Sequence, residues 1–204
     1  MLDEDTLTEA LEDLSARDAD IARGLDEVGR PDLRWGDPGF KTLLRAIVSQ
    51  QISKAAAATV WRRLEEAAGD LAPEPVAALD EDALRAAGLS RQKVSYVHGL
   101  AEAVMTGAID LDGLVGRPDG EVVTELVRLK GIGRWSAEIY LLFALHRPDA
   151  FPADDLALMV GAQRLKGLAE RPNSRRLTEI AESWRPWRGP AALLLWHYYA
   201  ATGR

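Results

Sequence analysis

Hydrophobic residues recur every three to four positions along most of the chain, with polar and charged residues between them. This spacing is typical of amphipathic α-helices, and no stretch alternates apolar and polar residues as a half-buried strand would. Ala, Leu, Arg and Glu dominate the composition, and all four favour helices. We therefore predict an all-α protein, with helices at about 5–28, 37–48, 53–68, 80–87, 91–106, 119–129, 134–146, 155–166, 174–183 and 188–202.

The composition excludes several kinds of site. The 204 residues include no cysteine, which rules out disulfides, cysteine-ligated zinc and a cysteine-ligated iron–sulfur cluster. The three histidines are too scattered for metal-binding spacing. The first residues lack the basic and apolar regions of a secretory signal, and no apolar run is long enough to span a membrane. We expect a cytoplasmic protein with no membrane partner.

The net charge of −7 is unevenly distributed. Residues 1–32 carry eleven acids and three arginines, whereas the rest of the chain carries 21 acids and 22 bases. The acidic excess thus belongs to the N-terminal helix, and the remaining chain is close to neutral. Such a protein can still bind DNA through backbone amides and a few well-placed cations.

The segment 126–140, Leu-Val-Arg-Leu-Lys-Gly-Ile-Gly-Arg-Trp-Ser-Ala-Glu-Ile-Tyr, predicts two helices joined by a tight turn. The first helix ends near Leu129, the turn contains Gly131 and Gly133, and the second helix begins near Arg134. Glycines permit positive φ, and the amides at a helix start suit a phosphate. The alternative is a corner whose glycines serve packing alone.

This segment resembles the helix-hairpin-helix of the DNA base-excision glycosylases. Three more segments match that family in order: Leu-Leu-Arg-Ala-Ile-Val-Ser-Gln-Gln-Ile-Ser at 43–53, Phe-Pro-Ala-Asp-Asp-Leu-Ala-Leu at 151–158 and Trp-Arg-Pro-Trp-Arg-Gly-Pro-Ala-Ala-Leu-Leu-Leu-Trp at 184–196. The last resembles bacterial 3-methyladenine DNA glycosylase II. The resemblance implies one domain over 1–204 in a compact form without the N-terminal β domain. Its two helical lobes would span about 37–118 and about 119–204 plus the N-terminal helix, with a cleft between them.

The resemblance also implies how the hairpin binds double-stranded DNA. The expected phosphate contacts are Gly131, Gly133, Arg134 and Ser136. Arg134 fits equally well as a solvated charge at a helix start. A Na⁺ or K⁺ ion would bind the backbone carbonyls of Val127, Leu129 and Ile132, and no other cofactor is required.

Asp155 is the expected catalytic residue, because the family signature ends in an aspartate at this position. Breaking an N-glycosidic bond builds positive charge on the sugar, which a nearby carboxylate stabilises. The alternative is that Asp154 and Asp155 only cap the helix that follows, since Asp is a favoured N-cap. We expect catalysis from Asp155, and capping or solvent exposure for Asp154.

Trp135 stands where the bifunctional relatives, similar to endonuclease III, carry the lysine that attacks the sugar. Lys130 lies before the turn and is no substitute. The departure implies hydrolysis by water without strand cleavage. An alkylated purine gains from stacking on indole, and the resemblance assigns Trp135 and Trp196 to the base pocket, with Tyr140 as an addition. One further aromatic position of the family is Ile139 here.

The other tryptophans are assigned from the general tendency of tryptophan to pack in the core. We expect Trp61, Trp184 and Trp187 to pack in the protein and leave Trp35 open.

Ser49, Gln50 and Gln51 are expected in a turn between two helices. In the family a side chain from this loop fills the space left by the flipped nucleotide, which offsets part of the cost of flipping. Gln51 is the first candidate for this wedge and Gln50 the second. Both also fit as ordinary polar residues at a helix start.

These observations imply a monomeric base-excision repair enzyme that flips out alkylated purines, chiefly 3-methyladenine and 7-methylpurines, and leaves an abasic site. The alternatives are the same fold acting on hypoxanthine, uracil or mismatched bases, and a non-catalytic helix-hairpin-helix module that only binds DNA. Asp155 argues against the latter, because a binding module does not need that carboxylate.

Overall fold

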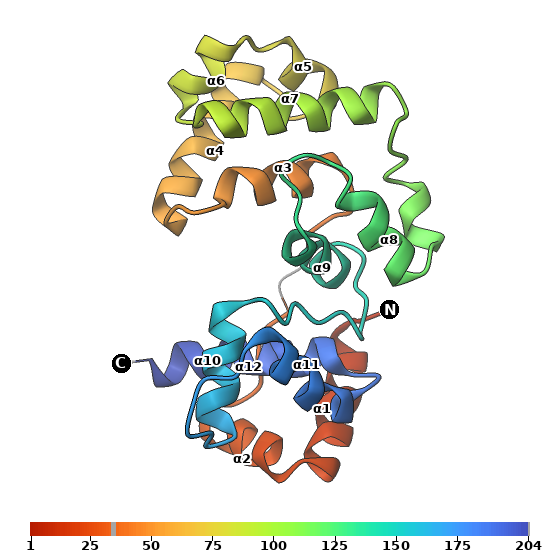
Figure 1. Cartoon of the computed structure of the whole chain (residues 1–204), viewed down its shortest axis with the longest axis vertical. Coiled ribbons are helices and arrows are strands. Elements are labelled where there is room, and N and C mark those ends of the chain that lie inside the picture. The colour runs from red at the N-terminus through yellow and green to blue at the C-terminus, as the bar shows by residue number, and fades with distance from the viewer. Residues whose placement is uncertain (34–35, 204) are drawn as a thin grey trace. The chain divides into compact units, whose positions relative to one another are not determined.

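A computed structural model describes residues 1–33 and 36–203. Every regular element in these residues is helical, which confirms the all-α prediction (Figure 1). The elements are α1 (Glu4–Arg17), α2 (Ala19–Val28), α3 (Phe40–Ser49), α4 (Lys54–Ala68), α5 (Pro73–Ala78), α6 (Glu81–Ala87), α7 (Arg91–Met105), η1 (Gly113–Gly116), α8 (Asp119–Leu126), α9 (Arg134–Phe143), α10 (Leu156–Leu165), α11 (Ser174–Ala181), η2 (Glu182–Trp184) and α12 (Arg188–Thr202).

Two elements differ from the sequence prediction. The helix expected at 5–28 is divided at Asp18, whose extended backbone ends α1 and whose carboxylate accepts hydrogen bonds from the Asp20 and Ile21 amides to begin α2. The short helix α5 was not expected, because its two prolines suggested a loop. A proline is compatible with the first turn of a helix, where its missing N–H would have no partner anyway.

The chain divides into two compact units. The hairpin unit comprises Gly36–Tyr140, and the split unit comprises Met1–Trp35 together with Leu141–Arg204. The lobe boundary expected near residue 118 is therefore wrong, because residues 119–140 belong with the preceding helices. Contacts within the hairpin unit account for this: Gln50 Nε2 donates to the Gly131 carbonyl at 2.8 Å, and Gly131 lies against the ring of Tyr96.

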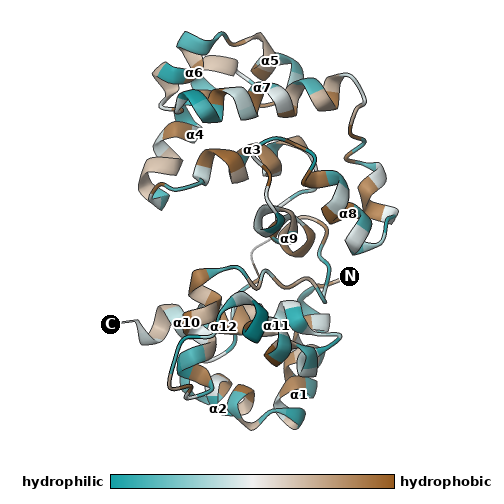
Figure 2. Cartoon of the chain, viewed as in Figure 1, coloured by the Kyte–Doolittle hydropathy of each residue, from teal (hydrophilic) through white to brown (hydrophobic). Residues whose placement is uncertain are grey.

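The core of the hairpin unit is formed by the apolar faces of its helices. Leu43, Leu44 and Ile47 of α3 are fully buried, as are Val97 of α7 and Val76 of α5. Figure 2 shows that helices such as α3 and α7 carry both hydrophobic and hydrophilic residues. This is the amphipathic pattern from which the helices were predicted.

The split unit is held by close packing between α10 and α12 and by one buried polar cluster. Gly161 of α10 lies so near Leu195 that a Cβ would be 2.5 Å from the Leu195 carbonyl oxygen. Trp184 is fully buried, as expected, and its Nε1 donates to Asp18 Oδ2 at 2.8 Å. Lys166 Nζ donates to Asp18 Oδ1 at 2.7 Å. These bonds tie the start of α2 to the C-terminal helices.

Candidate functional site

The turn between α8 and α9 is built around Gly131. Its φ is +92°, and a Cβ would overlap the Tyr96 ring, so both the backbone conformation and the space require glycine. Ile132 is 3% exposed and anchors the turn. Its N–H donates to the Leu129 carbonyl at 3.0 Å. The sequence-predicted hairpin is therefore present, and its turn packs against Tyr96.

The residues predicted to contact phosphate fall into two groups. Gly133 and Arg134 are exposed at the start of α9, and the Ala137 N–H makes a helical bond to the Gly133 carbonyl at 3.0 Å. Arg134 Nε pairs with Glu138 Oε1 at 2.9 Å, which holds the guanidinium on the helix. Gly131 is half-buried in the turn and Ser136 is only 3% exposed. The Ser136 side chain thus lies away from the exposed hairpin surface.

The carbonyls predicted to hold a monovalent cation belong to this same turn. The Leu129 carbonyl accepts the Ile132 N–H, and a carbonyl oxygen has a second lone pair for a cation. Val127 is 41% exposed at the end of α8. The cation remains a prediction. Among the described residues, no cluster of three His, Cys, Asp or Glu side chains offers a second kind of metal site.

The start of α9 also forms one wall of a hollow of about 510 Å³ within the hairpin unit. Trp135, Ser136, Ile139 and Tyr140 line this side, and the opposite side is formed by α3 with the turn that follows it. Gln50 and Gln51 lie at this turn and also line the hollow. The structure therefore brings together the two segments that the sequence assigned to the base pocket and the wedge.

Two aromatic residues, Trp135 and Tyr140, line the hollow. Trp135 is 38% exposed, so much of its indole is accessible to a ligand. Tyr140 is 1% exposed, and its Oη accepts the Gly39 N–H at 2.8 Å. Burial raises the pKa of the Tyr140 hydroxyl, while the Gly39 bond opposes the rise. The hydroxyl therefore keeps its proton and remains a neutral donor.

Two polar lining residues, Thr42 and Arg45, were not singled out from the sequence. Both belong to α3, where Thr42, Ala46 and Ser49 follow each other at helical spacing along the face that borders the hollow. That spacing could have placed Thr42 on the face of the wedge turn. No local signal distinguishes it from any other half-buried threonine.

The structure separates the two wedge candidates. Gln50 is half-buried, and its side chain is bound to the Gly131 carbonyl. Gln51 is exposed and has a φ of +58°, a left-handed conformation that is rare for a residue with a side chain. Gln51 is thus the more exposed of the two candidates, and its role as the wedge stays a prediction.

Asp155, in the split unit, is the N-cap of α10. Its Oδ1 accepts the Leu158 N–H at 3.0 Å and also the Trp196 Nε1–H at 3.0 Å. The Trp196 ring lies 5.6 Å from that of Phe143 between centroids, with 31° between the planes. Asp154 is exposed, as expected. The Asp155 carboxylate therefore both caps α10 and binds Trp196, a candidate pocket residue.

The remaining tryptophans occupy different surroundings. Trp196 contacts Asp155 and Phe143 in the split unit and does not line the hollow of the hairpin unit. Trp61 is half-buried on α4 with the Arg45 guanidinium 4.3 Å from its ring centroid, so it packs at the surface instead of in the core. Trp187 is half-buried at the start of α12. Trp35 lies outside the described residues.

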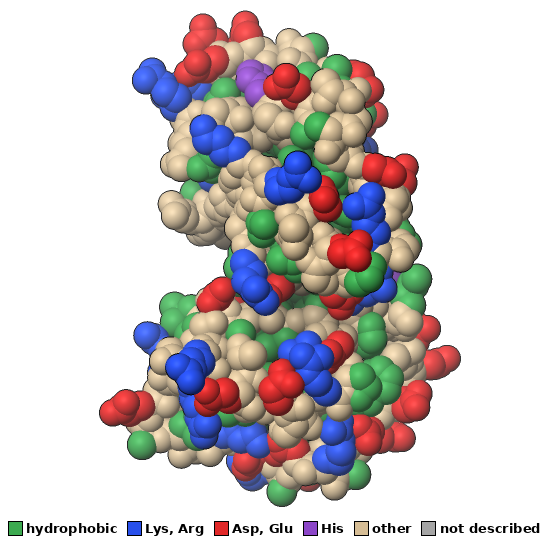
Figure 3. Space-filling model, turned by 45° about the vertical axis from the view of Figure 1, so that its right-hand side comes forward, with side chains coloured by type: hydrophobic (Ala, Val, Ile, Leu, Met, Phe, Trp, Pro, Cys, Tyr) green, Lys and Arg blue, Asp and Glu red, His purple; other side chains and the backbone are tan. Residues whose placement is uncertain are grey.

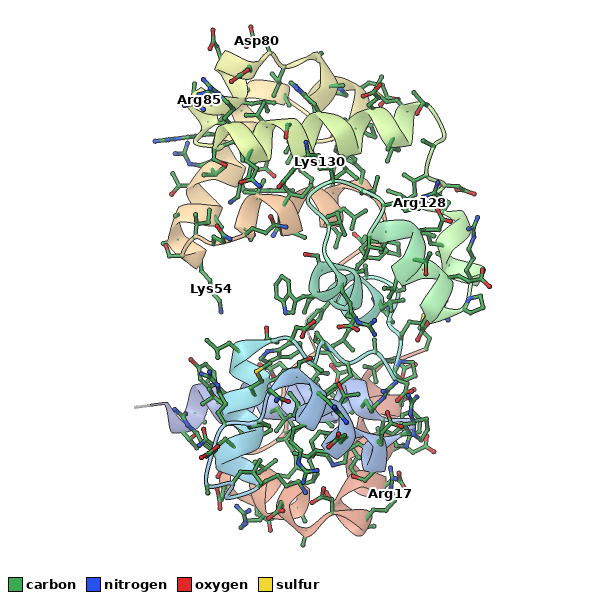
Figure 4. All side chains as sticks on the ribbon, in the orientation of Figure 1. Arg17, Lys54, Asp80, Arg85, Arg128 and Lys130 are labelled. Carbon is green, nitrogen blue, oxygen red and sulfur yellow. The ribbon has the colours of Figure 1, made fainter. Side chains whose placement is uncertain are left out.

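Charged side chains of both signs are mixed on the face of the molecule shown in Figure 3. In Figure 4, Arg128 and Lys130 come from the segment joining α8 to α9, and Lys54 comes from the start of α4. Lys130 is exposed beside the glycine turn. Within the described residues, no helix has the length and apolar character needed to cross a membrane.

Comparison with known proteins identifies the family. Residues 44–186 match the model for HhH-GPD superfamily base excision DNA repair proteins. DNA-3-methyladenine glycosylase 1 of Schizosaccharomyces pombe is 33% identical over 199 residues, covering 94% of this chain and 87% of the relative. DNA-3-methyladenine glycosylase 2 of Escherichia coli is 30% identical over 183 residues, covering 82% of this chain and 61% of the relative.

Solved structures agree with the sequence relatives. The S. pombe 3-methyladenine DNA glycosylase in complex with abasic DNA has a TM-score of 0.84 at 31% identity, covering 92% of this chain and 95% of that one. DNA-3-methyladenine glycosidase from Bacillus halodurans has a TM-score of 0.85 at 30% identity, covering 95% and 90%. The chain belongs to the HhH-GPD superfamily of base excision DNA repair proteins.

Proposed function

We propose that this protein is a monofunctional DNA glycosylase of base excision repair. It would bind double-stranded DNA as a monomer, flip an alkylated purine such as 3-methyladenine or a 7-methylpurine out of the duplex, and hydrolyse its N-glycosidic bond. The S. pombe and E. coli relatives are named DNA-3-methyladenine glycosylases, and these names support this substrate class. The observation that carries the proposal is the position of Trp135, directly after the hairpin and in the wall of a hollow of about 510 Å³.

The hollow has the character that an alkylated purine requires. Ligand pockets in proteins range from roughly 300 to 1,000 Å³, so the volume is adequate for one base. An alkylated purine carries a positive charge, which the electron-rich face of the accessible Trp135 indole attracts. Ile139 and the neutral Tyr140 add no charge to the hollow. Arg45 also lines it, and its guanidinium lies 4.3 Å from the centroid of the Trp61 ring.

Hydrolysis of such a base needs little further catalysis. As the bond from the sugar C1′ to the base nitrogen breaks, its electron pair neutralises the cationic base. Water then adds to C1′ and releases a proton, which leaves an abasic site. We assign Asp155 to stabilise the positive charge that develops on the sugar. Two hydrogen bonds to Oδ1 fix its orientation, and fixed groups need no reorganisation during the reaction.

The side chain after the turn supports the proposed absence of lyase activity. A lyase needs an amine that attacks C1′ and forms a Schiff base. Trp135 has no such amine, and Lys130 is exposed on the other side of the glycine turn. A Na⁺ or K⁺ ion at the Val127, Leu129 and Ile132 carbonyls would add a positive charge to the hairpin and strengthen its hold on phosphate.

The experiment is base release from methylated duplex DNA, followed by chromatography and by scoring of strand breaks before and after alkali. Wild type should release methylpurine and give breaks only after alkali. Asp155→Asn should release far less, while Asp154→Asn, which alters the exposed neighbour, should behave as wild type. Breaks without alkali would overturn the monofunctional assignment. Release of hypoxanthine or uracil in place of methylpurine would overturn the substrate class.

A further inference from the structure

Lys93 is the residue on which the inference rests. It lies in the first turn of α7, where its Nζ donates to the carbonyl oxygens of Val48 at 2.7 Å and Gln50 at 2.6 Å. Both carbonyls lie at the C-terminal end of α3. The last carbonyl groups of a helix have no hydrogen-bond partner within it, and this end of a helix carries a partial negative charge. Burial lowers the pKa of the Lys93 ammonium. Lys93 thus fixes the backbone where α3 passes into the wedge turn.

The same helix also contacts the hairpin. Tyr96 follows Lys93 by one helical turn, and its ring occupies the space that a Cβ on Gly131 would need. Gln92 donates a hydrogen bond to the Tyr96 hydroxyl and steadies the ring. Helix α7 therefore touches the wedge turn through Lys93 and the hairpin turn through Tyr96.

Gln50 completes the connection. Its backbone carbonyl accepts from Lys93, and its side-chain Nε2 donates to the Gly131 carbonyl at 2.8 Å. The next residue, Gln51, has a φ of +58°. A non-glycine residue keeps this conformation only where the surrounding structure holds it, and here the preceding residue is held at both its main chain and its side chain.

We propose that Lys93 is a positioning residue for base flipping. Its ammonium fixes the Gln50 carbonyl and so holds Gln51 in the conformation in which that side chain enters the duplex. The Gln50 to Gly131 bond then joins wedge insertion to the grip of the hairpin on phosphate. Lys93 itself touches neither the base nor the sugar. The inference rests on the proposed function, because it needs a wedge that acts on DNA.

Two readouts separate positioning from general stabilisation. The first is single-turnover excision of a methylated purine from a duplex and from single-stranded DNA, in which no partner base resists flipping. The second is the fluorescence of 2-aminopurine placed opposite a stable abasic-site analogue, which reports disturbance of the stack whatever base the enzyme removes. The variants are Lys93→Met, which removes the donor, and Lys93→Arg, which keeps one. Lys41→Met is the matched control, because Lys41 is an exposed lysine of the same unit that pairs with Asp70.

Lys93→Met should slow excision from the duplex by about tenfold, the size expected for loss of a charge-assisted hydrogen bond. Excision from single-stranded DNA and the thermal midpoint should change far less, and Lys93→Arg should recover much of the duplex rate. The 2-aminopurine signal should fall with Lys93→Met and not with Lys41→Met. An equal loss on both DNA forms, or an unchanged duplex rate and signal, would overturn the proposal.

A double-mutant cycle with Gln51→Ala tests the route of the effect. If Lys93 acts through Gln51, the double variant should be no slower than the slower single variant. Multiplicative losses would mean that Lys93 acts elsewhere. Should Lys93→Met fail to fold, Gln50→Leu removes the Gly131 bond and should give the same fall in 2-aminopurine signal. Wild type could release no methylpurine and still change the 2-aminopurine signal, with a smaller change for Lys93→Met. In that case the proposed substrate class is wrong and the positioning role of Lys93 stands.

Discussion

Trp196 Nε1 donates a hydrogen bond of 3.0 Å to Asp155 Oδ1, the same oxygen that caps α10 by accepting the Leu158 N–H. One donor is a backbone group of the helix and the other is an indole packed against Phe143. The carboxylate is therefore oriented by two parts of the split unit that are distant in sequence. Its capping role and its proposed catalytic role can be separated by substitution.

Asp155→Asn should abolish most base release without unfolding the protein. Asparagine is as good an N-cap as aspartate, so α10 keeps its first turn. It carries no charge, however, and removal of one electrostatic group from an active site costs about 100-fold in rate or more. Single-turnover excision and a thermal melt of the same preparation check this. A variant that melts like wild type and reacts like wild type would exclude Asp155 from catalysis.

Trp196→Phe should lower the excision rate with a modest loss of stability. Phenylalanine keeps an aromatic ring beside Phe143 but removes the donor to Asp155. The loss of one hydrogen bond costs about 1 kcal/mol in the free energy of unfolding, measured by urea denaturation. If catalysis needs an oriented carboxylate, the rate in Trp196→Phe falls further than the small change in stability explains. Trp187→Phe, at a half-buried tryptophan of the same unit, is the control.

Trp135→Ala should weaken excision of cationic bases. Stacking of a base on an aromatic side chain contributes roughly 1–3 kcal/mol, so a loss of about tenfold or more in kcat/KM is expected. Trp61→Ala removes the same side chain from a surface position on α4 and should leave the rate near that of wild type. Equal effects of the two substitutions would show that the hollow beside Trp135 is not the base pocket.

Gly131→Ala should destabilise the hairpin unit, whereas Gly133→Ala should not. Gly131 has positive φ and no space for a Cβ beside Tyr96, while a Cβ on Gly133 meets nothing within 4 Å. The strained backbone alone costs about 1–3 kcal/mol. Urea denaturation gives the change in the free energy of unfolding, and binding to undamaged duplex reports the hairpin. A Gly131→Ala protein as stable as Gly133→Ala would contradict the packing described.

The stability of the split unit should depend on pH through Asp18. Burial opposes ionisation of its carboxyl, but hydrogen bonds from Lys166 and Trp184 outweigh burial and hold the pKa of Asp18 below the usual value of 3.8. Because the pKa of Asp18 is lower in the folded protein than in the unfolded chain, its ionised carboxylate stabilises the fold at any pH above the unfolded-state pKa. This stabilisation is lost as the pH falls through the pKa of the folded protein. Wild type should therefore exceed Asp18→Asn in the free energy of unfolding at pH 7, and the difference should shrink below about pH 4. Urea denaturation across this range measures it. A difference independent of pH would mean that the carboxylate charge contributes nothing.

The spacing of hydrophobic residues predicted most helices to within a few residues. Because each helix buries one face, its hydrophobic residues recur every three to four positions. It missed the division at Asp18, where the partners that favour the break, Lys166 and Trp184, lie far along the chain. It also misplaced residues 119–140, since no local signal records that Gly131 packs on Tyr96.

The candidate site was predictable where it depends on local chemistry. The glycine turn, Trp135 and the glutamine pair lie in short segments, and the structure brings them to one hollow. The bonds that distinguish Gln50 from Gln51 were not predictable, because Lys93 and Gly131 reach Gln50 from other elements. Neither was the Trp196 bond to Asp155, which joins residues forty-one apart.

The polar cluster around Asp18 has a consequence for the order of events during synthesis. Helices α1 and α2 leave the ribosome before the hairpin unit, yet Lys166 and Trp184, which bind Asp18, are made only after the whole hairpin unit. Domains generally fold as units while the chain emerges, and residues 36–140 form one continuous unit. The N-terminal helices must therefore wait with their apolar faces uncovered while a later part of the chain folds before them. Hydrophobic surface exposed in this way makes a nascent chain prone to aggregation until its partners have been synthesised.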